Sequence, residues 1–388
     1  MWLVPALRFP EFNGEWNEER LDEIADLSKG FGISKEQLSD EGEHCILYGE
    51  LYTKYKSEII NEVVSKTNID TTKLKRSKRN DVIIPCSGET AIDIAVARCV
   101  PFDGILLGGD LNIIRLHNYD GAFMAYQLNG KRKTDIAKLA QGVSVVHLYG
   151  ESLKEISTFN PSLSEQQKIV RLLSLIDERI STQNKIIEKL ETLIKGIVEL
   201  AFSHAATSNT LGCYVTQISQ RNKIEKDLPV LSVSNKHGFV EQSEQFDDRI
   251  IASDDTSNYK IVNINDFAYN PARINVGSIA RLKDKECGIV SPMYICFRTS
   301  KDILPEYLEL FFKTVTFSSE VGKRLEGSVR LCLSYESLCE IVIPVISISE
   351  QQSLVKMVTT FYTKLDIEKG FLRNYQSQKQ YLLSQMFI

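Results

Sequence analysis

The chain has 388 residues, of which 43% are hydrophobic and 25% charged, and its formal net charge is −5. This length predicts two or three domains, and the composition is typical of a soluble globular protein. No apolar run approaches the roughly 18 residues that cross a bilayer, and Met1–Pro5 is not expected to begin a signal peptide. The eight cysteines include no CxxC pair, so we expect reduced thiols, a cytoplasmic location and no membrane association.

Residues 1–160 are expected to form an α+β domain with a mixed or antiparallel sheet. Short β-rich runs such as Asp81–Pro85 and Leu111–Leu116 alternate with turns, and a short helix is predicted over Glu151–Glu155. Two basic clusters, at residues 73–79 and 131–133, suit either a solvated face or contacts to phosphate. Both interpretations stay open at this point, because net charge is a weak test of nucleic-acid binding.

A long helix is predicted over residues 164–202, inside a spacer segment at 161–205. Ser162 or Ser164 can cap it, and Gln167 stands three residues after Ser164 as in a capping box. The apolar residues alternate in steps of four and three, with Gln183 in the one polar slot: Ile169, Leu173, Ile176, Ile180, Ile187, Leu190, Ile194, Ile197 and Ala201. This is a heptad seam, and a helix with one apolar seam needs a partner helix.

The second half repeats this plan, with a domain predicted at 206–345 and a helix at 346–388. Strands are expected in Ser291–Phe297 and Glu340–Pro344, and a helix in Glu306–Lys313. The seam of the second helix keeps the same phase, interrupted by two polar residues: Leu354, Val358, Phe361, Leu365, Glu368, Leu372, Tyr375, Lys379, Leu382 and Met386.

One constant offset relates the two halves. Ser-Glu-Gln-Gln occurs at 164–167 and, 185 residues later, at 349–352. The same offset pairs Asn80 with Asn265, Gly142 with Gly327, and Phe202 with Phe387. A domain-sized period indicates a duplicated unit, not a solenoid. We therefore predict an α+β protein with two similar α/β domains in a pseudo-twofold repeat, separated by two long helices that can pair as an antiparallel coiled coil or dock on partner subunits. A homodimeric coiled coil used only for assembly is the alternative.

No catalytic signature is present. The sequence has no GxGxxG turn and no GxxxxGK[ST] loop, and Asn270–Arg273 lacks the second proline and the aromatic of an amino-methylating motif. The five histidines show no metal-ligand spacing. Adjacent acidic pairs such as Asp247-Asp248 favour solvated loop charge over a metal site. A duplicated chain without these motifs is typical of a recognition and assembly protein.

Three phrases of the sequence resemble the specificity subunit of type I restriction–modification systems. They are Arg8-Phe9-Pro10-Glu11-Phe12-Asn13-Gly14-Glu15-Trp16, the run Leu163–Val170 at the start of the first helix, and Ile343–Gln352 before the second. The resemblance covers essentially the full length. Two residues depart from the pattern: Tyr362 stands where the first helix has Asp177, and Gly370 lies inside the second helix, where glycine costs about 1 kcal/mol relative to alanine.

The resemblance implies two target-recognition domains, each reading one half of a split, asymmetric site in double-stranded DNA. The paired helices would set the distance between half-sites and dock two methyltransferase (modification) subunits, with partner-binding residues at the helix starts: Glu165, Gln166, Gln167, Glu350, Gln351 and Gln352. No cofactor is expected in this chain. S-adenosylmethionine, ATP and magnesium would belong to partner subunits, including a separate restriction and translocase subunit.

The DNA contacts are predicted from residue type and from the turns that carry them. Gly142 and Gly327, at equivalent points, suit either a loop that approaches DNA closely or a simple turn. The candidates in the first domain are Lys78, Arg79, Ser87, Glu89, Thr90, Lys131, Arg132, Gln141, Gly142, Ser144 and His147. Those in the second domain are Arg273, Asn275, Gly327, Ser328 and Arg330.

Two other classes of function remain open at this stage. A coiled-coil scaffold could join proteins without reading DNA, and footprinting of the complex on DNA would separate it from the leading hypothesis. An enzyme acting alone is disfavoured by the missing motifs. Methyl transfer by the purified chain without any partner would support that third reading.

Overall fold

The computed structural model describes residues 3–203, 207–223, 228–235, 237–241, 256–327 and 330–388. These residues form two compact units. Unit 1 comprises Met1–Lys185 with Gly370–Ile388, and unit 2 comprises Ile186–Lys369. Each unit therefore holds one α+β domain, the beginning of the long helix that follows it, and the end of the other long helix.

Unit 1 is built on short strands and short helices before the first long helix. Its strands are β1 (Asn17–Arg20), β2 (Ala25–Lys29), β3 (Leu38–Ser39), β4 (Glu43–Ile46), β5 (Lys66–Thr67), β6 (Lys75–Arg76), β7 (Asp81–Pro85), β8 (Ser87–Gly88), β9 (Arg98–Val100), β10 (Leu106–Leu107), β11 (Leu111–Leu116), β12 (Val146–His147) and β13 (Ser157–Asn160). Its short helices are α1 (Leu21–Ile24), η1 (Lys35–Gln37), α2 (Glu50–Thr53), α3 (Ala91–Ile94), α4 (Gly121–Asn129), α5 (Lys133–Lys138) and α6 (Gly150–Leu153).

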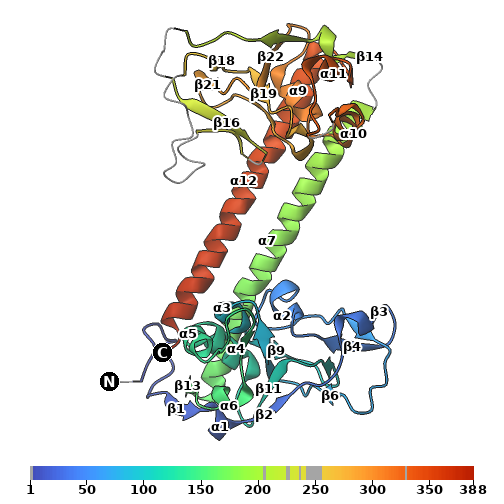
Figure 1. The fold of residues 1–388 in the computed structure, drawn as a ribbon. Helices are drawn as coiled ribbons and strands as arrows, with labels where there is room; N and C mark the ends of the chain where they lie inside the picture. The colour runs from blue at the N-terminus through green and yellow to red at the C-terminus, as the bar shows by residue number, and fades with distance from the viewer. Residues whose placement is uncertain (1–2, 204–206, 224–227, 236, 242–255, 328–329) are drawn as a thin grey trace. The chain divides into compact units, whose positions relative to one another are not determined.

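The centre of unit 1 is the antiparallel sheet β2-β11-β7-β9. Every residue of β7 is buried, which explains its unbroken apolar run Val82-Ile83-Ile84. Helix α4 packs on β7 and β9 (Figure 1). A second, five-stranded sheet, β3-β5-β4-β10-β6, contains the parallel pair β4 and β10, so the predicted mixed sheet is confirmed.

The first turns of α7 (Leu163–Ser203) pack against the last turns of α12 (Ile348–Gln385) within unit 1. Ile169, Leu173 and Ile176 share an apolar cluster with Leu382 and Met386. Asp177 bonds to Lys379 and Arg179 lies over the ring of Tyr375, so rising numbers on α7 meet falling numbers on α12. The two helices are therefore antiparallel here.

Unit 2 repeats this plan with fewer short strands. Its strands are β14 (Ser208–Thr210), β15 (Val215–Ile218), β16 (Val230–Ser234), β17 (Gly238–Glu241), β18 (Lys260–Asn263), β19 (Phe267–Tyr269), β20 (Ile279–Arg281), β21 (Cys287–Val290), β22 (Ile295–Thr299) and β23 (Val342–Pro344). Its short helices are η2 (Leu211–Cys213), η3 (Ile274–Val276), α9 (Pro305–Phe311), α10 (Val315–Arg324) and α11 (Tyr335–Cys339).

The sheet β15-β22-β19-β20 of unit 2 corresponds to β2-β11-β7-β9 of unit 1. The pair β14 and β23 corresponds to β1 and β13. Asn80 and Asn265, which precede β7 and β19, both have positive φ, at 80° and 70°. The duplication inferred from the sequence is thus also present in the strand order and backbone conformation.

The predicted heptad seam is present in both helices, with one drift in register. Along α7 the buried positions follow the prediction as far as Ile194, after which Val198 and Phe202 are buried while Ile197 and Ala201 are only half-buried. A straight helix of 3.6 residues per turn drifts by about 20° per heptad relative to a 3.5-residue repeat, which accounts for a shift of one position. Helix α12 runs through Gly370 without interruption.

Ser162, one of the two predicted caps, caps α7, and Ser347 caps α12. The hydroxyl of Ser162 accepts from the amide of Glu165, and Ser347 plays the same part toward Glu350. The carboxylate of Glu350 in turn accepts from the backbone amide of Ser347, which completes a capping box. Ser164, the alternative predicted cap, lies inside α7. In the part of the chain that the structure describes, no helix is long and apolar enough to span a membrane.

Candidate nucleic-acid interface

A small hairpin stands at one edge of the central sheet in unit 1, where β7 ends and β11 begins. Strand β8 pairs with β12, so that Ser87 lies opposite His147 and Gly88 opposite Val146. The amide and carbonyl of Gln141 both bond to His147, at N···O distances of 2.9 and 2.7 Å. Residues 142–146 form the tip, and Leu148 anchors it by donating to the carbonyl of Cys86 at 2.8 Å.

Unit 2 carries the same hairpin at equivalent positions. Glu326 exchanges two backbone hydrogen bonds with Cys332, at 3.0 and 2.8 Å, and Leu333 donates to the carbonyl of Pro271. These contacts reproduce those of Gln141, His147 and Leu148 at the 185-residue offset. The hairpins of the two domains therefore share one backbone conformation, which we call the matched frame, but they carry different side chains.

The glycine at each hairpin tip is explained by the turn itself. Gly142 and Gly327 have φ of +120° and +128°. A Cβ at either position would lie 2.2 Å from a carbonyl oxygen, that of Val145 in one hairpin and that of Arg330 in the other. Only glycine fits without strain. The turn interpretation is sufficient, and the closeness of these glycines to DNA stays a prediction.

The predicted residues of the first domain fall into two groups at this hairpin. Glu89, Thr90, Gln141, Gly142, Ser144 and His147 are exposed beside one another along the sheet edge. Ser87 is buried and its hydroxyl donates to Asp110 at 3.1 Å, so it is occupied inside the domain. Thr90 caps α3 by accepting from the amide of Asp93. The prediction for base contacts therefore narrows to the exposed members.

The predicted phosphate contacts lie away from the hairpin. Lys78 and Arg79 are exposed, but they precede β7 and therefore stand about 16 Å away at the opposite edge of the sheet. Arg132 donates to the carbonyl of Ile388 at 3.1 Å and its guanidinium lies over the ring of Phe159. It anchors the end of the chain, and only Lys131 beside it stays exposed.

The predicted residues of the second domain come together around one hollow of about 800 Å³. Arg273 and Asn275 arrive from the loop after β19, and Arg330 arrives from the hairpin. Ser328 lies outside the described residues. Sequence reasoning missed most of the remaining lining, because it comes from other strands and loops without a local motif: Ser232, Tyr259, Asn270, Ala272, Ser291, Met293, Tyr294 and Leu331.

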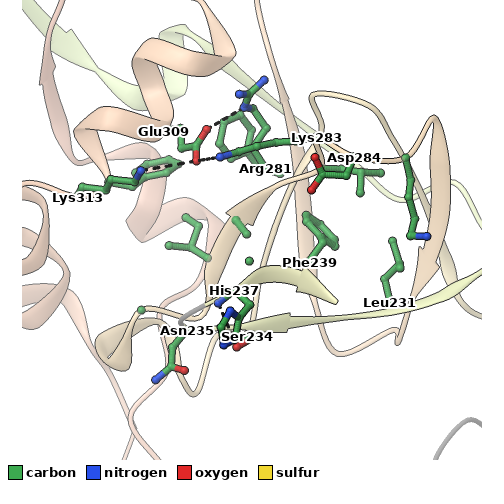
Figure 2. A pocket seen from close by; sticks show the side chains of 18 residues that line it. Leu231, Ser234, Asn235, His237, Phe239, Arg281, Lys283, Asp284, Glu309 and Lys313 are labelled. Carbon is green, nitrogen blue, oxygen red and sulfur yellow. Dashed lines mark hydrogen bonds and ion pairs between the residues drawn. The ribbon is translucent and has the colours of Figure 1, made fainter. Parts of the chain in front are cut away.

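A second hollow in unit 2, of about 410 Å³, is rich in charge but largely neutralised (Figure 2). Glu309 stands among Arg281, Lys283 and Lys313 and forms ion pairs with all three. Burial acts to raise the pKa of Glu309, but the hydrogen bond to Lys283 and the neighbouring cations outweigh it and lower that pKa. These cations hold the domain together and are not free for phosphate.

The helix starts, predicted to bind partner subunits, are mostly occupied inside the chain. Glu165 forms a two-pronged pair with Arg8, at 2.8 Å for both contacts. Gln166 and Gln351 are buried and bridge equivalent backbone groups, each donating to the carbonyl of the residue five positions earlier. The partner-binding prediction therefore narrows to Gln167, Glu350 and Gln352, which are exposed.

No cluster of three or more histidine, cysteine or carboxylate side chains suited to a metal occurs among the residues that the structure describes. The fold and the matched hairpins define the class of the molecule: a duplicated α+β protein whose two domains are joined to long helices that pack antiparallel.

Comparison with known proteins finds a match in sequence and similarity in fold. The sequence model of the type I restriction modification DNA specificity domain matches residues 13–192. The fold is similar to that of a type I restriction–modification system S subunit from M. genitalium, with a TM-score of 0.61, 19% identity, and 99% of each chain covered. It is also similar to a chain from a structure of type I R-M complex assembly and conformational transition, with a TM-score of 0.58, 14% identity, and 96% and 97% covered. Residues 13–192 thus match the type I restriction modification DNA specificity domain, and the whole chain has the fold of these two structures.

Proposed function

We propose that this chain is the DNA-reading specificity subunit of a type I restriction–modification complex. Each domain reads one half of a split, asymmetric site, and the helices set the spacing and dock two methyltransferase subunits. The observation that carries the proposal is the pair of matched hairpins. A constant backbone frame with unlike exposed side chains is what two readers of unlike half-sites require, since base contacts specify and the frame positions.

The spacing role rests on the length and continuity of the helices. Half-sites one turn of DNA apart lie about 34 Å from each other, so one domain cannot read both. A helix of 41 residues such as α7 is about 60 Å long, whereas a flexible linker would let the spacing vary. In this proposal S-adenosylmethionine, ATP and magnesium are bound by partner subunits, and the DNA target places the complex in the cytoplasm.

Modified-base sequencing tests the proposal directly. Host DNA from cells with and without this gene, each carrying the modification subunit, is compared for methylated motifs. A split, asymmetric motif that is lost with the gene is the expected result. A gene-independent methylation pattern, together with no protected sequence in footprinting of the assembled complex, would favour a scaffold instead.

A further inference from the structure

The two hairpins differ in chemistry at two equivalent positions. Val145 in the first domain corresponds to Arg330 in the second, and Gly88 corresponds to Arg273. Each pair occupies the same place in the matched frame, because β8 lies beside the hairpin in one domain and the loop after β19 lies beside it in the other. The second domain thus has two arginines at the positions where the first domain has a valine and a glycine.

The two arginines of the second domain are available to a ligand. Both are exposed, and no carboxylate within the described residues forms an ion pair with either. The backbone beneath Arg273 is fixed, since its amide donates to the carbonyl of Asn270 at 3.0 Å and the Asn270 side chain accepts from Ala272 at 3.1 Å. A fixed backbone with a free guanidinium fork suits two-pronged recognition of guanine O6 and N7 in the major groove.

The hairpin of the first domain exposes apolar surface instead. Val143 is 99% exposed and Val145 53% exposed, and residues 141–149 contain no lysine or arginine. Tyr149, with its ring beside that of His147, is also exposed at the foot of the hairpin. An aliphatic side chain at a reading position contacts the C5 methyl group of thymine, the one apolar group that a base pair presents in the major groove.

We propose that Arg330 reads a guanine in the half-site of the second domain, with Arg273 beside it, and that Val145 contacts a thymine methyl group at the corresponding place in the other half-site. This inference rests on the proposed function. It assigns a G·C pair to one half of the target and an A·T pair to the equivalent position of the other half.

The first test uses reciprocal substitutions in the full chain, expressed with its modification subunit. R330V should relax the methylated motif at one G·C position, reducing discrimination there by about 5- to 150-fold. V145R should change one A·T position in the opposite half. K301V is the matched control, because Lys301 is exposed in the same domain but follows β22, at the other edge of the sheet. It should leave the motif unchanged.

Single-atom changes in DNA give a sharper test with the purified complex. Replacing the assigned guanine by 7-deazaguanine removes N7, and should weaken binding by the unaltered complex but not by the R330V complex. Replacing the assigned thymine by uracil removes the methyl group, and should weaken binding by the unaltered complex but not by the V145A complex. If the base change weakens binding only while the side chain is present, that side chain contacts the altered atom of the base.

The inference and the proposed function fail in different ways. If R330V lowers methylation at all sites alike and leaves the motif unchanged, Arg330 contacts phosphate and the base assignment is wrong, while the split motif itself still supports the proposed function. The same conclusion follows if both substitutions act on one half of the motif. If the unaltered chain directs no methylated motif at all, the proposed function is wrong.

Discussion

The same level of the helix seam is polar in unit 1 and apolar in unit 2. In unit 1, Lys379 of α12 donates to Asp177 of α7 at 2.6 Å and to Glu58 at 2.5 Å, and the hydroxyl of Tyr126 donates to Asp177 at 2.7 Å. The equivalent positions of unit 2 hold Ile194 for Lys379, Tyr362 for Asp177 and Leu310 for Tyr126, the last counted from the helix caps Asp120 and Leu304. Equivalent positions at the two ends of the helix pair therefore hold a buried ion pair in unit 1 and uncharged side chains in unit 2.

The polar cluster of unit 1 is balanced in charge. Glu58 and Asp177 face Lys379, and Arg98 is the second buried cation nearby. Burial lowers the pKa of Arg98, while the charges of Glu58 and Asp177 act to raise it. Burial and the charge of Asp177 raise the pKa of Tyr126, which keeps it a neutral donor. A position of the apolar seam can therefore hold a charged side chain, such as Lys379, when the adjacent domain contributes an oppositely charged residue, such as Glu58.

The unit 2 counterpart is looser. A hollow of about 270 Å³ lies there, and the Tyr362 ring lies under the Lys313 ammonium. Its lining consists of Ile194, Val198, Tyr362 and Leu365 with the charged residues Glu191, Lys195, Lys313 and Lys369. Lys379 is therefore buried beside two carboxylates, whereas Ile194 at the equivalent position forms no ion pair.

Removing Lys379 is the largest expected perturbation of this comparison. K379A leaves Asp177 and Glu58 buried without their cation, so unit 1 should lose about 3–5 kcal/mol. The chain has two tryptophans, Trp2 and Trp16, both before the first strand of unit 1, and Trp16 packs against Phe387, two residues after α12. Urea unfolding followed by tryptophan fluorescence therefore reports on this unit.

The matched control is K154A in the same unit. Lys154 pairs with Glu151, but their side chains are 37% and 84% exposed, so the expected loss is about 0–1 kcal/mol. Equal losses for K379A and K154A would show that the cluster contributes no more than a surface ion pair.

Converting the cluster of unit 1 to apolar side chains tests the role of its charges. The quadruple variant K379M/D177L/E58L/R98M removes all four buried charges and should recover most of the stability lost in K379A, to within about 2 kcal/mol of the original chain. The hydroxyl of Tyr126 then loses its acceptor, which costs about 1 kcal/mol of the difference. A quadruple variant less stable than K379A would mean that the charges stabilise the unit by more than the cost of burying them.

A third prediction concerns a feature that the two domains share. Asp81 and Asp266 are buried, accept from the backbone amide three residues earlier, and bind Arg115 and Arg298 through two contacts each. D81N and D266N should each cost about 1–3 kcal/mol, because buried donors lose a charged acceptor. Tryptophan fluorescence should move only for D81N, and far-UV circular dichroism should detect both. A fluorescence change in D266N would contradict the separation of the units.

The smallest expected effect is a difference in acid sensitivity. Glu309 of unit 2 has a lowered pKa, whereas the equivalent position of unit 1, counted from the caps Asp120 and Leu304, is Ala125. Because the pKa of Glu309 is lower in the folded state than its ordinary value of 4.5, its ionisation stabilises the fold at a pH above 4.5. This contribution is lost as the pH falls through the folded-state pKa. E309Q should reduce the loss of unit 2 stability between neutral and acidic pH. An unchanged pH profile would remove Glu309 from this role.

Much of the architecture followed from periodicity, while the predicted contact residues stay predictions. Strands β7 and β11 and both long helices lie where the sequence predicts them, because an unbroken apolar run and a heptad seam are local signals. Helices α4 and α10 were missed, since α4 is buried on nearly all sides and has no amphipathic pattern to read. For the site, residue type alone selected Ser87 and Arg132, which the fold uses internally.

The glutamines that occur in both copies, Gln166 and Gln351, have the same structural role in each half. Gln166 and Gln351 are identical in two otherwise divergent halves because each satisfies backbone groups where a domain joins its helix: Asp120 and Pro161 in one, Leu304 and Ile346 in the other. Identity between the copies therefore indicates a shared structural task. The residues that differ between the copies, such as Val145 and Arg330, are the candidates for specificity.

By itself the sequence determined the duplication, the two α+β domains, the heptad seams and the absence of the catalytic motifs sought in it, because all of these are local or periodic properties of the chain. Only the tertiary structure decided which distant residues meet. It placed Arg273 beside Arg330 in one hollow, and it joined Lys379 to Glu58 across 321 residues of chain. The physical reason is that burial and pairing depend on chain segments far apart in sequence, and no periodicity encodes their approach.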